Sequence, residues 1–266
     1  MKDRYGREIT YLRISVTDRC NLRCVYCMPA EGVSLLSHDD ILSFEEITEV
    51  ARTAVDLGVF KIRLTGGEPL VRRGVPALVR MLKGIPGVKD LAMSTNGTLL
   101  AEFAPQLADA GLMRVNISLD TLNPQRFAEI TRGGDVNQVL AGIEAAEKAG
   151  LLPIKLNCVV SESVDEPDAR EVARFGRERG LEVRFIKKMD SASGKFSVVV
   201  GGAGGDCPRC NRIRLSANGM VRPCLFSDLG FSVRELGVKK ALVRAIQQKP
   251  EAGGPCSHNW IRAMGG

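Results

Sequence analysis

The sequence predicts an α/β fold, an open (β/α)6 partial TIM barrel with a small C-terminal extension, and two observations lead to it. Short runs rich in β-branched residues alternate with amphipathic helical patterns between residues 9 and 187. This alternation is typical of right-handed βαβ units with a parallel sheet, and six units are too few to close an eight-stranded barrel. Glycine-rich and polar stretches also follow the strands, at the end where such barrels carry their functional loops.

The strands and helices of the barrel are expected in alternation along the chain. The first helix has the clearest limits, because Ser43 and Glu46 form a capping box at its start and Gly58 ends it. The expected strands are 11–16, 60–65, 88–94, 113–119, 154–160 and 182–187. The expected helices are 44–57, 75–83, 99–110, 136–149 and 167–179.

A change of composition after the sixth strand divides the chain into three parts. Residues 1–188 form the barrel domain, and residues 189–206 are a linker rich in serine and glycine. Residues 207–266 form a C-terminal region with a helix near 232–248. A length of 266 residues and a hydrophobic content of 44% are sufficient for a large buried core.

The composition excludes several classes of protein. The chain has no run of 18 apolar residues, and its N-terminus lacks the apolar core of a signal peptide, so we expect a cytoplasmic protein with no membrane span. A net charge of +6 without a block of five Lys or Arg residues gives little support to nucleic-acid binding. A small anionic substrate fits this charge equally well. The eight cysteines would be reduced in the cytosol, where clustered cysteines more often bind metal than form disulfides.

The stretch CNLRCVYC places Cys20, Cys24 and Cys27 directly after the first strand. Three cysteines cannot all pair with one another, so two chemistries compete. An iron–sulfur cluster held by three thiolates keeps one iron open for an exogenous ligand. A structural zinc site needs a fourth ligand, for which His38 is the local candidate. The position after the first strand of a βα barrel favours the cluster.

A second group of three cysteines lies in the C-terminal region, at Cys207, Cys210 and Cys224. Its alternative interpretation is a zinc ribbon completed by Cys256 or His258. Arg212 and Arg214 lie two residues apart within this group and share one face if the segment is extended. Two guanidiniums beside a cluster suit an anionic or nucleotide substrate better than a structural zinc knuckle. We therefore favour a second, cluster-binding site in the C-terminal extension.

The first cysteine pattern, C-x3-C-x2-C with an aromatic residue before the last cysteine, resembles the radical S-adenosylmethionine (SAM) superfamily. The segment TGGEP at 65–69 is similar to the glycine-rich motif of that superfamily, and glycines allow a close backbone approach. The resemblance implies that SAM binds the open iron through its amino and carboxylate groups. The polar residues at the next strand ends have an alternative role as helix caps and Asx-turns. The implied SAM site consists of Tyr26, Gly66, Gly67, Glu68, Ser94, Thr95, Asn96, Ser118, Asp120 and Met189.

Both cysteine groups and the order of the motifs resemble the GTP 3′,8-cyclase (MoaA) family of molybdenum cofactor (molybdopterin) biosynthesis. The match runs from YLRISVTDRCNLRCVYCMP through KIRLTGGEPLVRR, MSTNGTLL, VNISLDTL and IKLNCVV to CNRIRL and the final GG. It implies a lyase with two [4Fe–4S] clusters. Such an enzyme uses a 5′-deoxyadenosyl radical made from SAM to convert GTP to (8S)-3′,8-cyclo-7,8-dihydroguanosine 5′-triphosphate. In this family the second cluster binds the guanine edge.

The same resemblance implies substrate-binding and catalytic residues. Several strand-borne cations at one mouth would attract a triphosphate, and a solvated strand edge is the alternative for each of them. The implied GTP-binding residues are Arg13, Lys61, Arg63, Thr65, Lys155, Arg184, Arg212 and Arg214. The implied catalytic residues are Arg13, Arg212, Arg214, Gly265 and Gly266, the last two in a tail that lacks side chains and can approach the ligands.

The resemblance implies an electron donor such as flavodoxin or ferredoxin and a downstream cyclic pyranopterin monophosphate synthase, and it leaves a homodimer open. The chain departs from the family in the much shorter connection before Cys207, in Lys187 where an acidic residue is usual, and in Asp190 where proline is usual. Two alternatives therefore stay open: a related radical SAM enzyme for a different nucleotide or a peptide, and a zinc-stabilised binding module. We expect Cys158 to be buried and Cys256 to be a spare thiol.

Overall fold

The strands form one curved sheet. The computed structural model describes residues 1–190 and 192–257. In these residues the strand order is β6-β5-β4-β3-β2-β1-β7-β8-β9. Neighbours from β6 to β7 are parallel, and β8 and β9 are added antiparallel. The bounds are β1 Tyr11–Ser15, β2 Lys61–Thr65, β3 Asp90–Thr95, β4 Arg114–Ser118, β5 Lys155–Val160, β6 Glu182–Lys187, β7 Arg212–Leu215, β8 Met220–Arg222 and β9 Phe231–Ser232.

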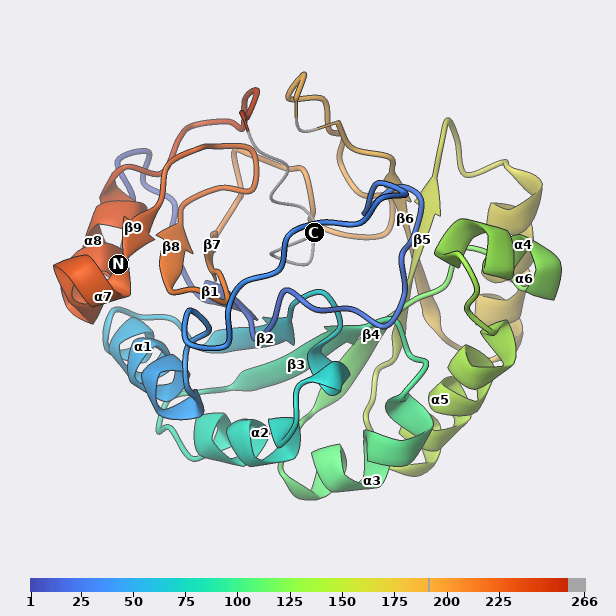
Figure 1. The fold of residues 1–266 in the computed structure, drawn as a ribbon. Coiled ribbons are helices and arrows are strands. Elements are labelled where there is room, and N and C mark those ends of the chain that lie inside the picture. The colour runs from blue at the N-terminus through green and yellow to red at the C-terminus, as the bar shows by residue number, and fades with distance from the viewer. Residues whose placement is uncertain (191, 258–266) are drawn as a thin grey trace.

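The helices lie on the outer face of the curved sheet, and loops, not helices, cross its inner side (Figure 1). This arrangement confirms the predicted open partial barrel, because the sheet does not close on itself between β6 and β9. The bounds are α1 Phe44–Asp56, α2 Val75–Lys83, α3 Leu100–Asp109, α4 Pro124–Thr131, α5 Val136–Lys148, α6 Pro167–Glu178, α7 Val233–Leu236 and α8 Val238–Gln247, with a short 3-10 helix at Pro69–Val71.

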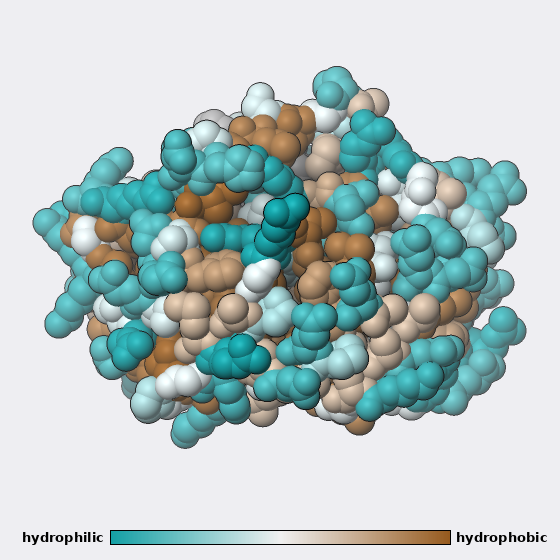
Figure 2. Space-filling model, turned by 60° about the horizontal axis from the view of Figure 1, so that its bottom comes forward, coloured by the Kyte–Doolittle hydropathy of each residue, from teal (hydrophilic) through white to brown (hydrophobic). Residues whose placement is uncertain are grey.

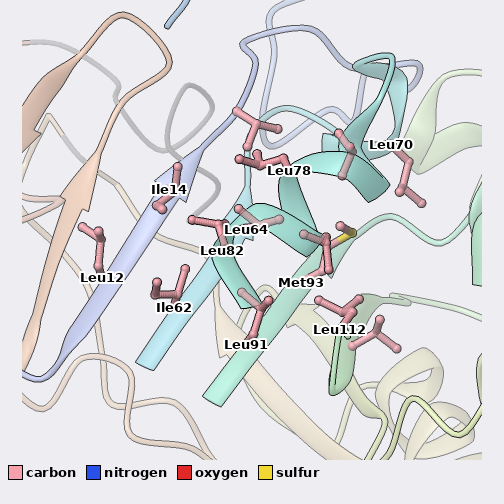
Figure 3. Close-up of a cluster of buried hydrophobic side chains, with 14 of the residues drawn as sticks. Leu12, Ile14, Ile62, Leu64, Leu70, Leu78, Leu82, Leu91, Met93 and Leu112 are labelled. Atoms are coloured by element: carbon pink, nitrogen blue, oxygen red, sulfur yellow. The ribbon is translucent and has the colours of Figure 1, made fainter. Parts of the chain in front are cut away.

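Apolar side chains at alternate strand positions form the core between sheet and helices. Leu12, Ile62 and Leu91 occupy such positions and have no exposed surface. Figure 3 shows them packed beside Leu78 and Leu82 of α2. Successive strand residues point to opposite faces. The side chains next to these apolar residues in each strand therefore point to the inner face of the sheet. The core therefore fixes which side chains face the interior of the barrel.

The predicted strands of the barrel are confirmed to within two residues, and so is the capping box of Ser43 and Glu46. The single helix predicted near 232–248 is wrong. The chain instead forms α7 and α8, separated by Gly237, whose φ of 78° ends one helix before the next begins. The prediction also missed α4, which begins after the side-chain cap of Asn123 with Pro124 in its first turn.

On the face of the molecule in Figure 2, hydrophilic side chains surround separate apolar patches. Isolated apolar residues on a surface are normal and need no special explanation. None of the helices in the described part of the chain is long and apolar enough to cross a membrane.

Candidate functional site

The inner face of the sheet carries cations in register on neighbouring strands. Arg13 of β1 pairs with Arg63 of β2 on one side and with Arg214 of β7 on the other. Tyr11 lies two residues before Arg13 in β1, and its partners in register are Lys61 of β2 and Arg212 of β7. Parallel pairing places residues of equal register side by side, so positive charge accumulates across the middle of the sheet.

These side chains line a cavity of about 310 Å³ on the inner face of the sheet. Asn116 and Asn157 contribute amide groups, and the segment between β6 and Cys207 supplies one wall. We refer to this space as the cationic cavity. Its basic lining residues are Arg13, Lys61, Arg63, Arg114, Lys155, Arg184, Arg212 and Arg214.

The deepest guanidiniums of the cationic cavity are nearly removed from water. Arg13, Arg63 and Arg214 are 6–7% exposed, and burial lowers the pKa of Arg13 to about 9. Within the described residues, the Nε atoms of Arg63 and Arg214 and both amide atoms of Asn116 have no hydrogen-bond partner. Buried polar groups are rarely left without partners, so the guanidinium and amide donors fit an anionic ligand in the cavity, and the Asn116 oxygen can accept a hydrogen bond from a polar one.

Tyr11 lies among the cations at the base of the cavity. Its ring centroid is 5.1 Å from Lys61 Nζ, 5.7 Å from Arg63 Cζ and 5.6 Å from Arg212 Cζ, which are cation–π distances. Burial alone would raise the pKa of Tyr11, but the charges of Arg63 and Arg13, then of Arg212 and Lys61, lower it. The tyrosine thus partly offsets the mutual repulsion of its neighbours.

Two carboxylates at the edge of the cavity pair with other cations. Asp90 accepts hydrogen bonds of 2.6 and 2.8 Å from Arg114 Nη2, and its Oδ2 lies 3.3 Å from Lys61 Nζ. Glu182 forms an ion pair with Lys155. Even with these acids, the lining carries an excess of positive charge, which favours a ligand with several negative charges.

The first cysteine group lines a second cavity of about 190 Å³, the cysteine cavity, at the carboxyl ends of the strands. The predicted SAM residues that line it are Tyr26, Gly66, Gly67, Ser94, Thr95, Asn96, Ser118 and Met189. Thr65, which the family resemblance assigns to GTP, also lies here and not among the residues of the cationic cavity. Ser94, Asn157, Ile186 and Met189 line both cavities, so the two adjoin.

The three thiols of the cysteine cavity fit an iron–sulfur cluster in their chemistry. Cys20 Sγ accepts hydrogen bonds from Leu22 N at 3.4 Å and from Asn96 Nδ2 at 3.8 Å. Burial and the neighbouring Cys27 raise the pKa of Cys24 to about 12. Thiols this crowded become thiolates readily only when a cationic group binds them. His38 is exposed and does not line this cavity in the described part of the chain.

Glu68 and Asp120, also predicted to bind SAM, do not line either cavity in the described structure. Glu68 is fully buried and accepts hydrogen bonds from Leu70 N, Thr95 Oγ1 and Asn96 N at 2.6 to 3.0 Å. Asp120 accepts a 2.6 Å hydrogen bond from the Tyr26 hydroxyl. Both carboxylates therefore hold the loops that line the cysteine cavity.

The second cysteine group lines the cationic cavity itself, at Cys207, Cys210 and Cys224. Burial would raise the pKa of Cys210, but Lys249, the backbone N–H of Arg212 and the neighbouring guanidiniums lower it. A thiol with a lowered pKa suits a metal ligand. The three thiols have the chemistry of metal ligands, and they lie at the wall of the cationic cavity.

The remaining predictions about single residues have mixed outcomes. Cys158 is buried as predicted, at 1% exposure. Cys256 is also buried, its Sγ 3.8 Å from the carbonyl oxygen of Leu225, and it is not part of the lining of the cationic cavity as described.

In the described chain, no three His, Cys, Asp or Glu side chains are placed to share a single metal ion. His258, Gly265 and Gly266 lie outside the described residues.

Sequence reasoning missed four polar strand residues of the cationic cavity: Tyr11, Arg114, Asn116 and Asn157. A signal for them was available, because each lies an even number of residues from a predicted site residue in the same strand. Arg114 and Asn116 precede Ser118 in β4 by four and two positions, and the period of a strand is two. Tyr11 similarly precedes Arg13 in β1.

Comparison with known proteins agrees with this fold and site. The family model for the radical SAM superfamily matches residues 14–176. Native anSMEcpe with bound AdoMet has the same fold, with a TM-score of 0.63 and 14% identity over 96% of this chain and 87% of that one. Streptococcus suis SuiB bound to precursor peptide SuiA gives 0.67 and 13% over 97% and 70%. The chain belongs to the radical SAM superfamily.

Curated relatives narrow the assignment. The chain is 44% identical to the GTP 3′,8-cyclase of Pelotomaculum thermopropionicum over 94% of each chain. It is 40% identical to that of Geobacter sulfurreducens over 95% of this chain and 93% of the other. Within the superfamily, it therefore belongs to the GTP 3′,8-cyclase family. The Pelotomaculum alignment covers 306 positions, more than the 266 residues here, so that relative contains segments that this chain lacks.

Proposed function

We propose that this chain is a GTP 3′,8-cyclase that converts GTP to (8S)-3′,8-cyclo-7,8-dihydroguanosine 5′-triphosphate. One observation carries the proposal: a strongly cationic cavity adjoins the cysteine cavity and also contains a second group of three cysteines. A nucleoside triphosphate needs several cations for its phosphates. Its ribose must also reach SAM in the cysteine cavity. The two cavities share lining residues, so a ligand in one can contact a ligand in the other.

The two cysteine groups would hold two [4Fe–4S] clusters, the first on Cys20, Cys24 and Cys27 and the second on Cys207, Cys210 and Cys224. With SAM bound, the first cluster would supply the radical chemistry that begins the reaction at the ribose. Gly66 and Gly67 line the SAM side of the cysteine cavity, where a Cβ at Gly67 would lie 2.3 Å from the carbonyl oxygen of Arg19. This close packing favours glycine at that position.

The residues of the chain would bind and orient the substrate. Arg63, Lys155 and Arg184 would neutralise the triphosphate. Arg214, close to the second cysteine group, would orient the nucleoside, and Arg212, on the same strand, would lie between the nucleoside and the phosphates. Because Arg13 and Arg214 are nearly buried, little water would compete with the substrate for their charges.

The enzyme also needs partners that its chemistry implies. An electron donor such as flavodoxin or ferredoxin would supply reducing equivalents, and a cyclic pyranopterin monophosphate synthase would consume the product. We place the enzyme in the cytoplasm, where its thiols stay reduced. A homodimer is a further proposal that sedimentation of the reconstituted protein would test.

The test is an anaerobic assay of reconstituted protein with reductant and SAM, with and without GTP, that measures 5′-deoxyadenosine and the cyclised nucleotide. We expect cyclised product from the wild type and its loss in Arg212→Ala. Arg52→Ala is the matched control, because Arg52 is an exposed residue of α1 and is not among the described lining residues. Formation of 5′-deoxyadenosine with intact GTP would assign the radical chemistry to a different nucleotide or a peptide. Colourless protein that contains zinc would favour the binding module.

A further inference from the structure

The short connection before the second cysteine group forms one wall of the cationic cavity. Most residues between positions 196 and 206, here named the wall segment, line the cavity: Phe196, Ser197, Val199, Gly202, Ala203, Gly204, Gly205 and Asp206. This position makes the wall segment a candidate for a substrate contact.

The wall segment is held in place at its start and in its middle. Val200 pairs with Phe185 of β6 through two backbone hydrogen bonds of 3.0 and 3.1 Å. Phe196 stacks on Phe226 with a centroid distance of 4.5 Å. Beyond Val200 the chain turns tightly, since Val199 N donates a 2.8 Å hydrogen bond to the carbonyl oxygen of Gly204, and Gly205 has a φ of 79° with room for no Cβ, which would lie 2.1 Å from the carbonyl oxygen of Ser197. The segment is therefore a positioned loop and not a loose linker.

The wall segment contacts two of the cavity's cations directly. Arg212 Nη2 donates a 2.8 Å hydrogen bond to the carbonyl oxygen of Ala203. Gly202 lies against Arg184, so that a Cβ on this glycine would be 3.3 Å from Arg184 Cδ. The one acidic side chain of the segment, Asp206, is neutralised by an ion pair of 2.5 Å with Arg209. The local charge of the wall is therefore set by Arg184 and Arg212.

Backbone donors lie beside these two guanidiniums. In the described residues, the N–H groups of Ala203, Gly204 and Gly205 have no acceptor, and Ala203 and Gly205 are exposed. Free N–H groups of a glycine-rich loop next to guanidiniums are a combination that binds phosphate oxygens. The small side chains of this stretch also leave room for a ligand to approach the backbone.

We propose that the wall segment binds the phosphate chain of the nucleotide, with Ala203 to Gly205 contributing backbone donors between Arg184 and Arg212. The inference rests on the proposed function for the identity of the nucleotide. If so, the wall segment helps the protein to distinguish nucleotides by their number of phosphates. The strand cations alone would distinguish them only by total charge.

The test compares two substitutions at one exposed position. Ala203→Glu places a carboxylate on the cavity side of the wall, and Ala203→Gln has the same size without the charge. Val198→Glu is the control for charge elsewhere in the segment, because Val198 is 58% exposed and is not among the described lining residues. Binding of GTP, GDP, GMP and guanosine to the anaerobic, reconstituted proteins is measured by calorimetry, and thermal unfolding verifies that each variant is folded.

We expect Ala203→Glu to weaken GTP binding by about tenfold or more relative to Ala203→Gln, because like charges repel at short range. The loss should decrease as phosphates are removed and vanish for guanosine, and Val198→Glu should bind like the wild type. An equal loss for GTP and guanosine would assign the wall to the base and overturn the proposal. So would GTP binding that is the same in Ala203→Glu and Ala203→Gln.

A second titration separates this inference from the proposed function. If the wild type does not bind GTP, the substrate assignment fails, and inorganic tripolyphosphate is then titrated into the same proteins. Weaker tripolyphosphate binding in Ala203→Glu than in Ala203→Gln would still support the phosphate-binding wall. Equal binding in the two variants, or no tripolyphosphate binding by any of the proteins, would overturn it.

Discussion

Lys249 lies just beyond α8 and donates a hydrogen bond of 2.6 Å from its Nζ to the carbonyl oxygen of Pro223, the residue before Cys224. The same Nζ donates to the carbonyl oxygen of Arg212 at 2.8 Å, and Lys249 is 1% exposed. A cation buried to this extent needs acceptors and nearby negative charge. Lys249 therefore joins the two parts of the second cysteine group, which the sequence separates.

Replacement of this lysine should impair the proposed second cluster. Lys249→Met leaves two buried carbonyl groups without a donor, which costs about 1–3 kcal/mol of stability. The iron content of the reconstituted protein should fall from about eight atoms toward about four per chain. Lys249→Arg should restore part of the loss, and Lys240→Met, at an exposed position of α8, should have no effect. Full iron content in Lys249→Met would contradict the prediction.

Tyr26 and Asp120 should act as one unit in the cysteine cavity. The Tyr26 hydroxyl donates a 2.6 Å hydrogen bond to Asp120, which also accepts from Val159 N at 2.8 Å. We expect Tyr26→Phe and Asp120→Asn each to weaken SAM binding, because either change frees the ring that lines the cavity. In a double-mutant cycle the two should be coupled by about 1.5–3 kcal/mol. Tyr5→Phe, at an exposed ring, is the control, and additive effects would show that the contact is unimportant.

The fold was predictable from the sequence because local patterns determine it. Strand runs such as 11–16 and 154–160 have the composition of strands, and the alternation with helices defines a parallel barrel. Helix α4 was missed because it has only eight residues, of which Phe127 and Thr131 are buried, although Asn123 followed by Pro124 is a start signal. The pairing of β7 with β1 joins residues about two hundred positions apart, and no local pattern encodes it.

The site was predictable in its residue types and less so in its contacts. The cysteines and strand cations have the expected places, because the motifs follow strand ends. Glu68 and Asp120 differ: their carboxylates are taken up by hydrogen bonds to neighbouring loops, which depend on tertiary structure. The wall segment was read as a linker because serine and glycine predict flexibility, whereas the contact between Val200 and Phe185 fixes it.

Glu68 should make stability depend on pH. Burial raises its pKa to about 7, against the lowering effect of its hydrogen bonds to Asn96, Leu70 and Thr95. Because the pKa in the unfolded chain is about 4.3, the folded protein binds this proton more tightly. The stabilising contribution of Glu68 is therefore complete below that value and is lost as the pH rises through the folded pKa.

The measurement is urea unfolding of the wild type and of Glu68→Gln across this pH window. The difference in their free energies of unfolding should change in favour of the variant by up to about 3 kcal/mol as the pH rises from about 5 to about 8. Glu102→Gln, at an exposed position of α3, should show a constant difference from the wild type. A constant difference for Glu68→Gln as well would mean that Glu68 is already ionised throughout.

Asp90 should limit the affinity of the cationic cavity for anions. Burial would raise its pKa, but its contacts with Arg114 and Lys61 lower it, so it is ionised at neutral pH. Asp90→Asn removes the negative charge that these two cations share and leaves both for the ligand. We expect the Kd for GTP to decrease about three- to tenfold. The affinity should also depend more steeply on salt, because more cations then meet the phosphates. The loss of the partly buried ion pair should lower the free energy of unfolding by about 1 kcal/mol.

Asp109→Asn is the matched control, since it makes the same change in net charge at an exposed position at the end of α3. It should leave both GTP binding and its salt dependence unchanged. Weaker GTP binding in Asp90→Asn would give this carboxylate the opposite role. Asp90 would then hold Arg114 and Lys61 in the geometry that the substrate requires. This orientation would strengthen GTP binding more than the negative charge of Asp90 weakens it.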